Sequence, residues 1–186
     1  FIINLKGIDI KKESIDFFVT LPHKSKDKRI CAFFEKPIPE AEKFFSEIIF
    51  KDKLTGFDKK EAKKIAQRYD FFVSQAPLMA SVASSFGRIL GPRGKMPSPQ
   101  LGSIITKIDE KALRELVEKL QRTVKLKAKG ELALKAAIGD ESMPDEQIAD
   151  NTLAVYDAAV AHLPKGQENI KSFLIKTTMR KPIKLI

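Results

Sequence analysis

The spacing of hydrophobic residues changes twice along this chain. Near the start, apolar and polar positions alternate, as in Ile15, Phe17, Val19 and Leu21. A period of two is typical of strands that have one covered face, so the pattern predicts strands over 1–7 and 15–21.

Between residues 30 and 121, short apolar runs alternate with stripes of helical spacing. The runs cover 30–34, 48–50 and 71–73, and helices are predicted from Pro39 and over 62–69, 78–86 and 109–121. Buried strands separated by helices are typical of a parallel sheet covered on both faces. This part of the chain therefore predicts a Rossmann-like βαβ domain.

From Thr123 the period of two returns. Residues 123–129 and 132–138 both alternate, with Gly130 between them, which predicts an antiparallel hairpin with a basic outer face. A helix follows over about 145–163. Its predicted buried stripe is Ala149, Leu153, Tyr156, Val160 and Leu163, and two final strands are predicted over 169–178 and 183–186.

Strands at both chain ends with a βαβ region between them predict an α/β protein of two domains. Residues 1–28 plus 122–186 would form a discontinuous, open sandwich-like α/β domain, and residues 29–121 an inserted Rossmann-like domain with a parallel sheet. Because the chain crosses twice between small domains, we also expect a hinge.

One ten-residue stretch, Arg88–Pro97, holds two glycines, two prolines and three cations. Glycine relaxes the backbone and proline opposes helix continuation, so we predict a shaped turn or loop whose cations suit an anion. It is not a phosphate-binding P-loop, because Ile89 stands where that motif has glycine and Met96 where it has Ser or Thr. The dinucleotide-binding glycine spacing is also absent.

Composition favours a polyanionic partner. The 186 residues carry 34 Lys and Arg against 24 Asp and Glu, a net charge of +10. The single cysteine, Cys31, lies in an apolar run and is expected to pack in a core. With only two histidines, no catalytic or metal site and no cofactor is predicted. No apolar stretch approaches the ~20 residues of a membrane helix.

The end of the chain is the strongest candidate surface. Residues 171–184 contain five cations and no acidic residue. Hydroxyl groups here can reach phosphate oxygens and ribose 2′-OH groups, and a methionine offers a flexible apolar surface. The alternative is a solvated edge strand guarded by lysines.

Two segments identify a known family. Gly87–Pro97 and Ile175–Pro182 resemble the signature and the C-terminal rRNA-binding motif of the universal ribosomal protein L-one family, and the resemblance covers the whole chain. Lys95-Met96 and Lys181-Pro182 look more archaeal or eukaryotic than bacterial. The sequence begins at Phe1, inside a predicted strand, so we also expect a preceding segment that includes further RNA-contacting residues of the family.

The resemblance implies a discontinuous RNA-binding domain and an inserted Rossmann-like one. It implies a cytoplasmic, non-enzymatic constituent of the large ribosomal subunit, a monomer within the ribosome. Its implied partners are the rRNA of the mobile side stalk near the E site, the E-site tRNA whose release it assists, and its own mRNA, whose translation it represses. The RNA-binding residues expected on this basis are Lys6, Lys127, Lys129, Ser172, Lys176, Thr177, Thr178, Met179, Arg180 and Lys181.

Some alternatives stay open at this stage. Gly91, Pro92, Arg93, Gly94 and Lys95 form either a structural turn or an RNA contact. Arg180 stands where the family usually has glycine, so it either displaces the RNA slightly or replaces a backbone contact with a phosphate contact. The rival to the RNA-binding hypothesis is an enzyme whose inserted domain binds a nucleotide or phosphometabolite, and a third possibility is a basic protein-interaction module.

Overall fold

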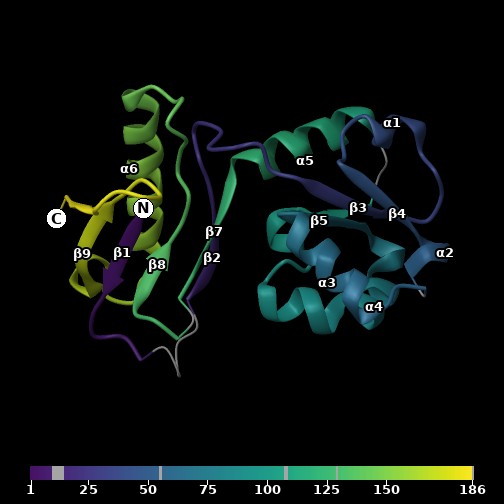
Figure 1. The fold of residues 1–186 in the computed structure, drawn as a ribbon, viewed down its shortest axis with the longest axis horizontal. Coiled ribbons are helices and arrows are strands. Elements are labelled where there is room, and N and C mark those ends of the chain that lie inside the picture. The colour runs from purple at the N-terminus through teal and green to yellow at the C-terminus, as the bar shows by residue number, and fades with distance from the viewer. Residues whose placement is uncertain (10–14, 55, 107–108, 129, 186) are drawn as a thin grey trace. The chain divides into compact units, whose positions relative to one another are not determined.

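The computed structural model describes residues 1–9, 15–54, 56–106, 109–128 and 130–185, which divide into two compact units. Phe1–Lys26 and Arg122–Ile186 form one, here called the terminal unit, and Asp27–Gln121 form the other, the inserted unit. In Figure 1 the purple start and the green-to-yellow end of the chain build the terminal unit together.

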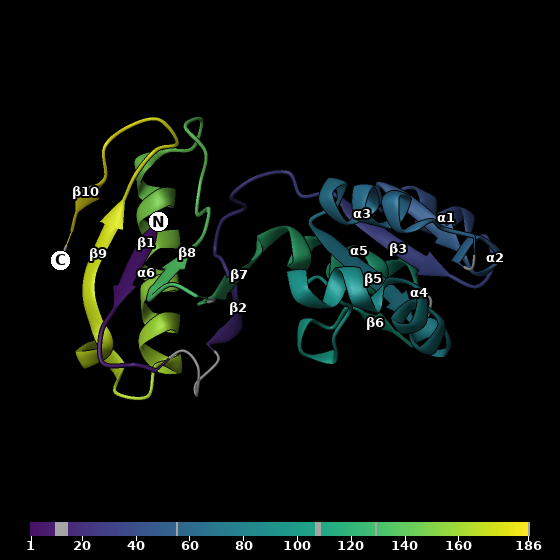
Figure 2. The same ribbon diagram turned by 60° about the horizontal axis from the view of Figure 1, so that its bottom comes forward.

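The terminal unit contains an antiparallel sheet of four strands in the order β10-β9-β1-β8. These strands are β1 (Ile2–Leu5), β8 (Ala133–Lys135), β9 (Ile170–Ile175) and β10 (Ile183–Lys184). A separate antiparallel ribbon joins β2 (Asp16–Thr20) to β7 (Thr123–Lys127). The long helix α6 (Asp145–His162) lies along one face of the four-stranded sheet, and a 3₁₀ turn, Gly166–Asn169, leads into β9 (Figure 2).

The core of the terminal unit lies between this sheet, the ribbon and α6. Ile3, Leu134 and Phe173 are buried on one sheet face, and Val155 and Ala159 face them from α6. The alternate residues of the strands form the opposite face. Strand alternation therefore separates a closed core from an outward face within one sheet.

The inserted unit has a four-stranded sheet in the order β4-β3-β5-β6, and every strand pair is parallel. Its strands are β3 (Ile30–Phe34), β4 (Glu47–Phe50), β5 (Phe71–Gln75) and β6 (Ile104–Ile105). The helices are α1 (Pro39–Glu42), α2 (Lys51–Leu54), α3 (Lys59–Arg68), α4 (Met79–Arg93) and α5 (Glu110–Arg122), with 3₁₀ turns at Ala76–Leu78 and Pro99–Leu101.

Helices cover both faces of this parallel sheet. Phe33 and Phe72 pack with buried residues of α3 and α4 on one face, and Figure 1 shows α5 on the other. All five residues of β3 are buried, which explains why this strand reads as a continuous apolar run. The predicted α/β class with a parallel inserted sheet is confirmed.

Lys28 and Gln121 lie next to the points where the chain enters and leaves the inserted unit. The backbone N–H of Lys28 donates to Oε1 of Gln121 at 2.9 Å, and Nε2 of Gln121 donates to the Lys28 carbonyl at 2.8 Å. The Lys28 ammonium also donates to the Gln121 carbonyl at 2.9 Å. The two crossing segments are thus tied together at the base of this unit.

The predicted hairpin between 123–129 and 132–138 is wrong. β7 pairs with β2, and β8 pairs with β1 in the other sheet. The inward positions were predicted correctly, because Val124, Leu126 and Ala128 are buried. Alternation indicates which side chains of a strand face the core, but it does not indicate which strand is the partner. The two strands were predicted to pair only because they are neighbours in the sequence.

The predicted loop at Arg88–Pro97 is wrong over its first half, because α4 continues through Pro92 to Arg93. Pro92 lies in the last turn, where it lacks the N–H that would bond to the Arg88 carbonyl, and the helix nevertheless continues to Arg93. Gly94 then ends the helix with a left-handed φ of 65°. Its N–H donates to Gly91 O and that of Lys95 donates to Leu90 O, which is a Schellman motif.

The predicted stripe of α6 is confirmed in its second half, where Leu163 is buried and Tyr156 and Val160 pack against the core, and is wrong in its first half. Ala149 and Leu153 are exposed, Leu153 by 60%, whereas Asn151, Thr152, Val155 and Ala159 are buried. Two polar residues occupy the buried face at this level of the helix. A search for apolar spacing therefore selected the wrong side over the first half of the helix only.

Candidate nucleic-acid interface

The connection between β9 and β10 is an exposed basic loop. Every residue from Lys176 to Leu185 is exposed, and the Met179 side chain is 94% exposed. A turn at Thr178 and Met179 is closed by the N–H of Arg180, which lies 3.4 Å from the Thr177 carbonyl oxygen. Because Lys176, Arg180, Lys181 and Lys184 occur here without an acidic residue, the loop presents positive charge to solvent.

The outward face of the four-stranded sheet continues this surface. Ser172 lies opposite Asn4, whose Nδ2 donates to the serine hydroxyl at 2.8 Å. Two residue pairs further along, on the same face, Ile2 lies opposite both Leu174 and Lys135, and Lys184 lies opposite Leu174. Directly paired residues share a face. The face therefore carries an apolar centre, Ile2 and Leu174, between two lysines.

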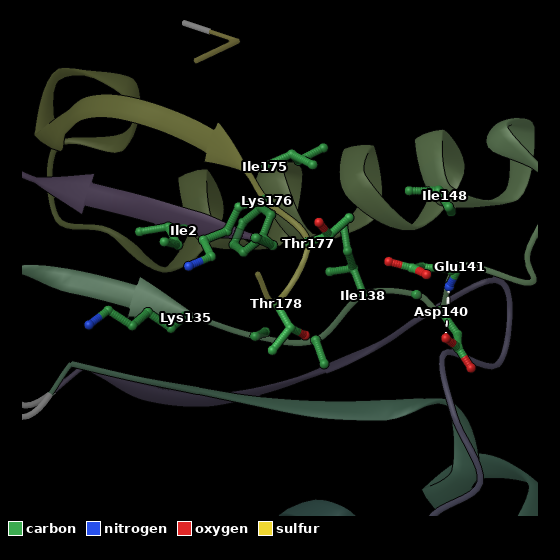
Figure 3. Close-up of a pocket in the computed structure, with 14 residues that line it drawn as sticks. Ile2, Lys135, Ile138, Asp140, Glu141, Ile148, Ile175, Lys176, Thr177 and Thr178 are labelled. Carbon is green, nitrogen blue, oxygen red and sulfur yellow. Dashed lines mark hydrogen bonds between the residues drawn. The ribbon is translucent and has the colours of Figure 1, made fainter. Parts of the chain in front are cut away.

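An open pocket of about 950 Å³ lies where β1, β8 and β9 meet the basic loop. Lys176, Thr177 and Thr178 line it on the loop side, and residues 135–141 form the other wall. Figure 3 shows Thr177 and Thr178 beside the segment that carries Ile138, with Asp140 and Glu141 further along that segment. The pocket thus combines hydroxyl groups and cations with an apolar floor and two carboxylates.

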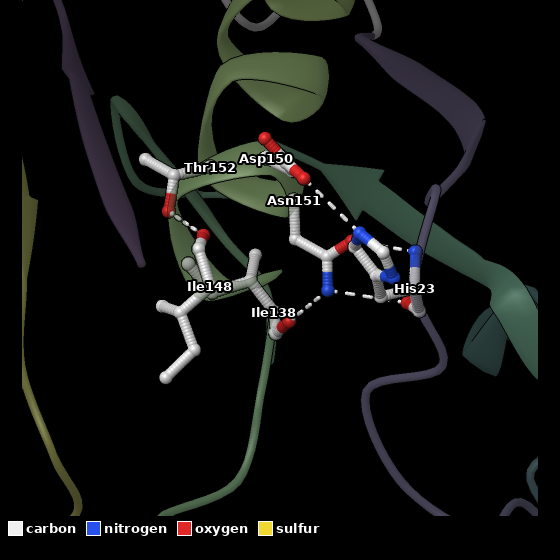
Figure 4. Close-up of polar contacts among 6 residues, drawn as sticks. All are labelled: His23, Ile138, Ile148, Asp150, Asn151 and Thr152. Carbon is white, nitrogen blue, oxygen red and sulfur yellow. Dashed lines mark hydrogen bonds and ion pairs between the residues drawn. The ribbon is translucent and has the colours of Figure 1, made fainter. Parts of the chain in front are cut away.

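A buried amide holds the wall that carries Ile138. The Nδ2 of Asn151 donates to the Ile138 carbonyl at 2.8 Å and to the His23 carbonyl at 3.1 Å. The His23 N–H donates back to Oδ1 of Asn151 at 2.9 Å (Figure 4). Asn151 is 0% exposed, so these bonds satisfy a polar group that water cannot reach.

Sequence reasoning missed Asn151. The available signal was helical spacing, because Asn151 lies three residues after Ile148 and four before Val155 and so shares a helix face with them. The neighbouring Asp150 lies 3.1 Å from Nε2 of His23, but both side chains are substantially exposed. That ion pair adds little to stability.

The remaining predicted RNA-binding lysines differ in their surroundings. Lys6 is exposed just after β1, with its backbone fixed by Asn169. Lys127 lies in the β2–β7 ribbon rather than in the sheet of the basic loop, and its Nζ is 3.2 Å from an oxygen of Asp16, which also pairs with Lys125 at 2.8 Å. Lys129 lies outside the described residues.

The signature segment Gly91–Lys95 lies in the inserted unit, where Gly94 and Lys95 make structural contacts. Gly94 provides the helix end, and Lys95 directs its ammonium to the end of α3. It donates to the carbonyl oxygens of Ala66 and Tyr69 at 3.0 and 2.6 Å. A lysine at a helix C-terminus satisfies unpaired carbonyls and complements the helix dipole. Gly91, Pro92 and Arg93 are exposed.

Two further groups, one buried and one exposed, have local packing roles. The Cys31 thiol is buried, and burial followed by the nearby Glu47 raises its pKa, which opposes the reactive thiolate. The His162 ring stacks on Phe17 with centroids 4.3 Å apart. Within the described residues there is no group of three His, Cys, Asp or Glu side chains that could hold a metal ion. No helix among them is long and apolar enough to cross a bilayer.

Comparison with known proteins gives the same family as the two motifs. The chain matches the Ribosomal protein L1p/L10e family over residues 1–180. It is 38% identical over 189 residues to the large ribosomal subunit protein uL1 of Nanoarchaeum equitans, covering 100% of this chain and 89% of that protein. The uL1 protein of Methanobrevibacter smithii is 38% identical over 192 residues, covering 100% and 87%. That of Thermococcus kodakarensis is 36% identical over 189 residues, covering 98% and 85%.

These matches place the chain in the class of structural proteins of the large ribosomal subunit. More specifically, the chain belongs to the ribosomal protein L1p/L10e family. The resemblance inferred from the two motifs is confirmed, and the relatives reported above are archaeal. Family membership also means a cytoplasmic ribosomal constituent that is not an enzyme, so the nucleotide-dependent enzyme is ruled out.

Proposed function

We propose that this protein binds the rRNA of the mobile side stalk near the E site through the exposed edge of its terminal unit. The observation that carries the proposal is the basic loop, in which cations, two threonines and Met179 are all exposed with no acidic residue between Ile170 and Leu185. The terminal unit is accordingly the proposed RNA-binding domain.

The chemistry of the loop suits a structured RNA. Its lysines and Arg180 would neutralise phosphates, which supplies most of the affinity and makes it dependent on salt. The hydroxyls of Thr177, Thr178 and Ser172 would contact phosphate oxygens and 2′-OH groups, which distinguish RNA from DNA. Met179 would place a polarizable thioether against a ribose or base.

Arg180 fits this proposal as a phosphate contact. No described residue other than glycine has a positive φ, so the backbone at Arg180 does not require glycine. The side chain is exposed next to Lys181. We propose that it replaces a close backbone approach with a charged hydrogen bond to a phosphate.

Two further roles belong to the proposal. A protein held on a mobile stalk near the E site would assist the release of deacylated tRNA. An mRNA element shaped like the stalk would occupy the same basic loop, so excess protein would repress translation of its own message. The family resemblance implies both roles, and rRNA and mRNA would share the basic loop.

A filter-binding titration across a salt series tests the main proposal. The probes are the stalk rRNA fragment and a scrambled helix of equal length. We expect tight binding to the stalk fragment that persists at moderate salt, and weak binding to the scrambled helix. Equal affinity for both, with a slope of about −0.7 to −0.9 per phosphate contact, would show only a basic surface and contradict stalk recognition.

The mRNA role is tested by competition in the same assay. A leader fragment of the protein's own message should displace the stalk fragment stoichiometrically, and a shuffled leader should not. Simultaneous binding of both RNAs would contradict a shared surface.

A further inference from the structure

Helix α3 of the inserted unit carries an unusual concentration of positive charge. Among its ten residues, five are Lys or Arg and one is acidic. Lys60, Lys63, Lys64 and Arg68 are all exposed, and we call these four residues the α3 basic face. At about 100° per residue they occupy one side of the helix, with only the neutral Gln67 between them.

The opposite side of α3 is already used. Ala62, Ala66 and Tyr69 are buried in the core of the inserted unit, and Ile65 packs against it. The helix therefore cannot insert an apolar face into a membrane or a partner's groove. Only the charged face is available for binding.

This charge arrangement works against the stability of the helix. Lys60 and Lys64, and likewise Lys64 and Arg68, are four residues apart, and like charges at this spacing repel each other. Among the described residues, Lys60, Lys63 and Lys64 form no ion pair. No ion pair among the described residues therefore offsets the repulsion between these lysines, although α3 also carries Glu61.

Helix α5 of the same unit shows the ordinary arrangement. It mixes three glutamates with four cations, and Arg114 pairs with Glu118 one turn away at 3.3 Å. Both helices have one buried apolar side. A helix of this unit can therefore keep its outer side in water with charges of both signs, as α5 does. The excess of positive charge on α3 points to an anionic partner.

We propose that the α3 basic face is a second RNA-binding surface, which takes the phosphate backbone of an RNA strand without reading its bases. Lys60, Lys64 and Arg68 form a row about 12 Å long, which corresponds to roughly three to four nucleotide steps of a helical strand. Arg93, exposed two residues before the Lys95 that contacts the end of α3, can extend the positive charge.

RNA suits this face better than a protein does. Lysine is depleted at protein–protein interfaces, which favour aromatic residues, and the α3 basic face exposes none. The surface lies in the inserted unit and does not depend on the basic loop of the terminal unit. The phosphates can belong to rRNA or to tRNA, which present the same chemistry.

The test compares two triple variants of the full chain that change the net charge equally. The first is Lys60→Gln, Lys63→Gln and Lys64→Gln. The control is Lys36→Gln, Lys43→Gln and Lys111→Gln, three exposed lysines away from α3. Each is titrated against the stalk rRNA fragment and, separately, against deacylated tRNA, between about 50 and 200 mM salt.

We expect the α3 variant to bind one of the two RNAs about 10- to 100-fold more weakly, with a salt slope reduced by about 2 to 3. The control should change the slope by less than half as much. The RNA whose slope changes is the source of the phosphates. An unchanged slope for both RNAs, or an equal change in both variants, would overturn the proposal.

Other readouts separate this proposal from the stalk-binding one. The α3 variant should keep its preference for the stalk fragment over the scrambled helix, because that preference belongs to the basic loop. It should also melt at the same or a higher temperature than the wild type, since a repulsion has been removed. A lower melting temperature with proportional loss of all RNA binding would mean that α3 is damaged and would contradict a role limited to phosphate contacts.

Discussion

The ammonium group of Lys95 lies 2.6 Å from the carbonyl oxygen of Tyr69, so a residue of the signature segment closes the end of a helix that is remote in sequence. A second bond to Ala66 O, at 3.0 Å, fixes the ammonium against the last turn of α3. The Schellman motif at Gly94 places Lys95 there. The segment therefore joins α4 to α3 within the inserted unit.

Replacing Lys95 by Met should lower the free energy of unfolding by about 1 to 2 kcal/mol, because two carbonyls lose a charged donor at a half-exposed site. Affinity for stalk RNA should change little. Urea unfolding and filter binding on the same preparation check both parts. Lys111→Met makes the same change at an exposed position away from α3, and this matched control should stay within about 0.5 kcal/mol.

The opposite result would reverse the assignment. If Lys95→Met left the unfolding curve unchanged but abolished RNA binding, the segment would be an RNA contact. If Arg93→Gln also abolished RNA binding without changing the unfolding curve, the RNA contact would include the exposed part of the turn.

The signature segment shows where sequence reasoning reaches its limit. Glycine and proline correctly indicate an end to the helix, but a proline in the last turn is compatible with a helix, so the predicted boundary came too early. The target of Lys95 depends on how α3 and α4 pack. No local pattern in the sequence records that packing.

Asn151 is expected to be the most sensitive polar residue of the terminal unit. Asn151→Leu removes three hydrogen bonds and leaves backbone groups of His23 and Ile138 buried without partners. We expect a loss of about 2 to 4 kcal/mol in unfolding free energy. Asp150→Ala, which removes only the exposed contact to His23, should cost at most about 1 kcal/mol.

Chemical denaturation of the two variants checks this difference. Because Asn151 holds the pocket wall at Ile138, the Leu variant should also bind stalk RNA less tightly if that wall contributes to binding. Equal stability of the two variants would show that the amide has no special role.

The terminal unit illustrates a second limit. The inward positions of β7 could be predicted because alternation follows the pleat of a single strand. Its pairing with β2 could not, since the two strands are separated by the whole inserted unit. For the same reason, the sequence did not predict that the Asp16 carboxylate pairs with both Lys125 and Lys127. This ion pair competes with RNA phosphates for the Lys127 ammonium.

Thr178 and Met179 test the basic loop without disturbing the fold. Both are exposed, so Thr178→Val and Met179→Asp should leave the melting temperature almost unchanged. Each should weaken stalk-RNA binding by roughly 1 to 3 kcal/mol, through an unpaired polar group or a repelled phosphate. The exposed Leu153→Asp on α6 controls for the charge change. Unaltered affinity in both loop variants would show that the assigned site is wrong.

Tyr69 links the stability of the inserted unit to alkaline pH. Burial, and then the hydrogen bond that its hydroxyl donates to Glu47, raise the pKa of Tyr69 to about 12. An unfolded tyrosine has a pKa of about 10. Because the folded pKa is the higher one, this contribution to stability is fully present below pH ~10 and is lost as the pH rises towards ~12.

The free energy of unfolding should therefore fall between about pH 10 and 12, and it should fall less steeply in Tyr69→Phe, which cannot ionise there. Urea unfolding at several pH values measures both slopes. Tyr156→Phe removes the only other tyrosine, so ultraviolet absorbance in that background reports the Tyr69 phenolate alone. If its absorbance titrated near pH 10 in the folded protein, the Tyr69 phenol would not be protected by burial and Glu47, and the predicted pH dependence would fail.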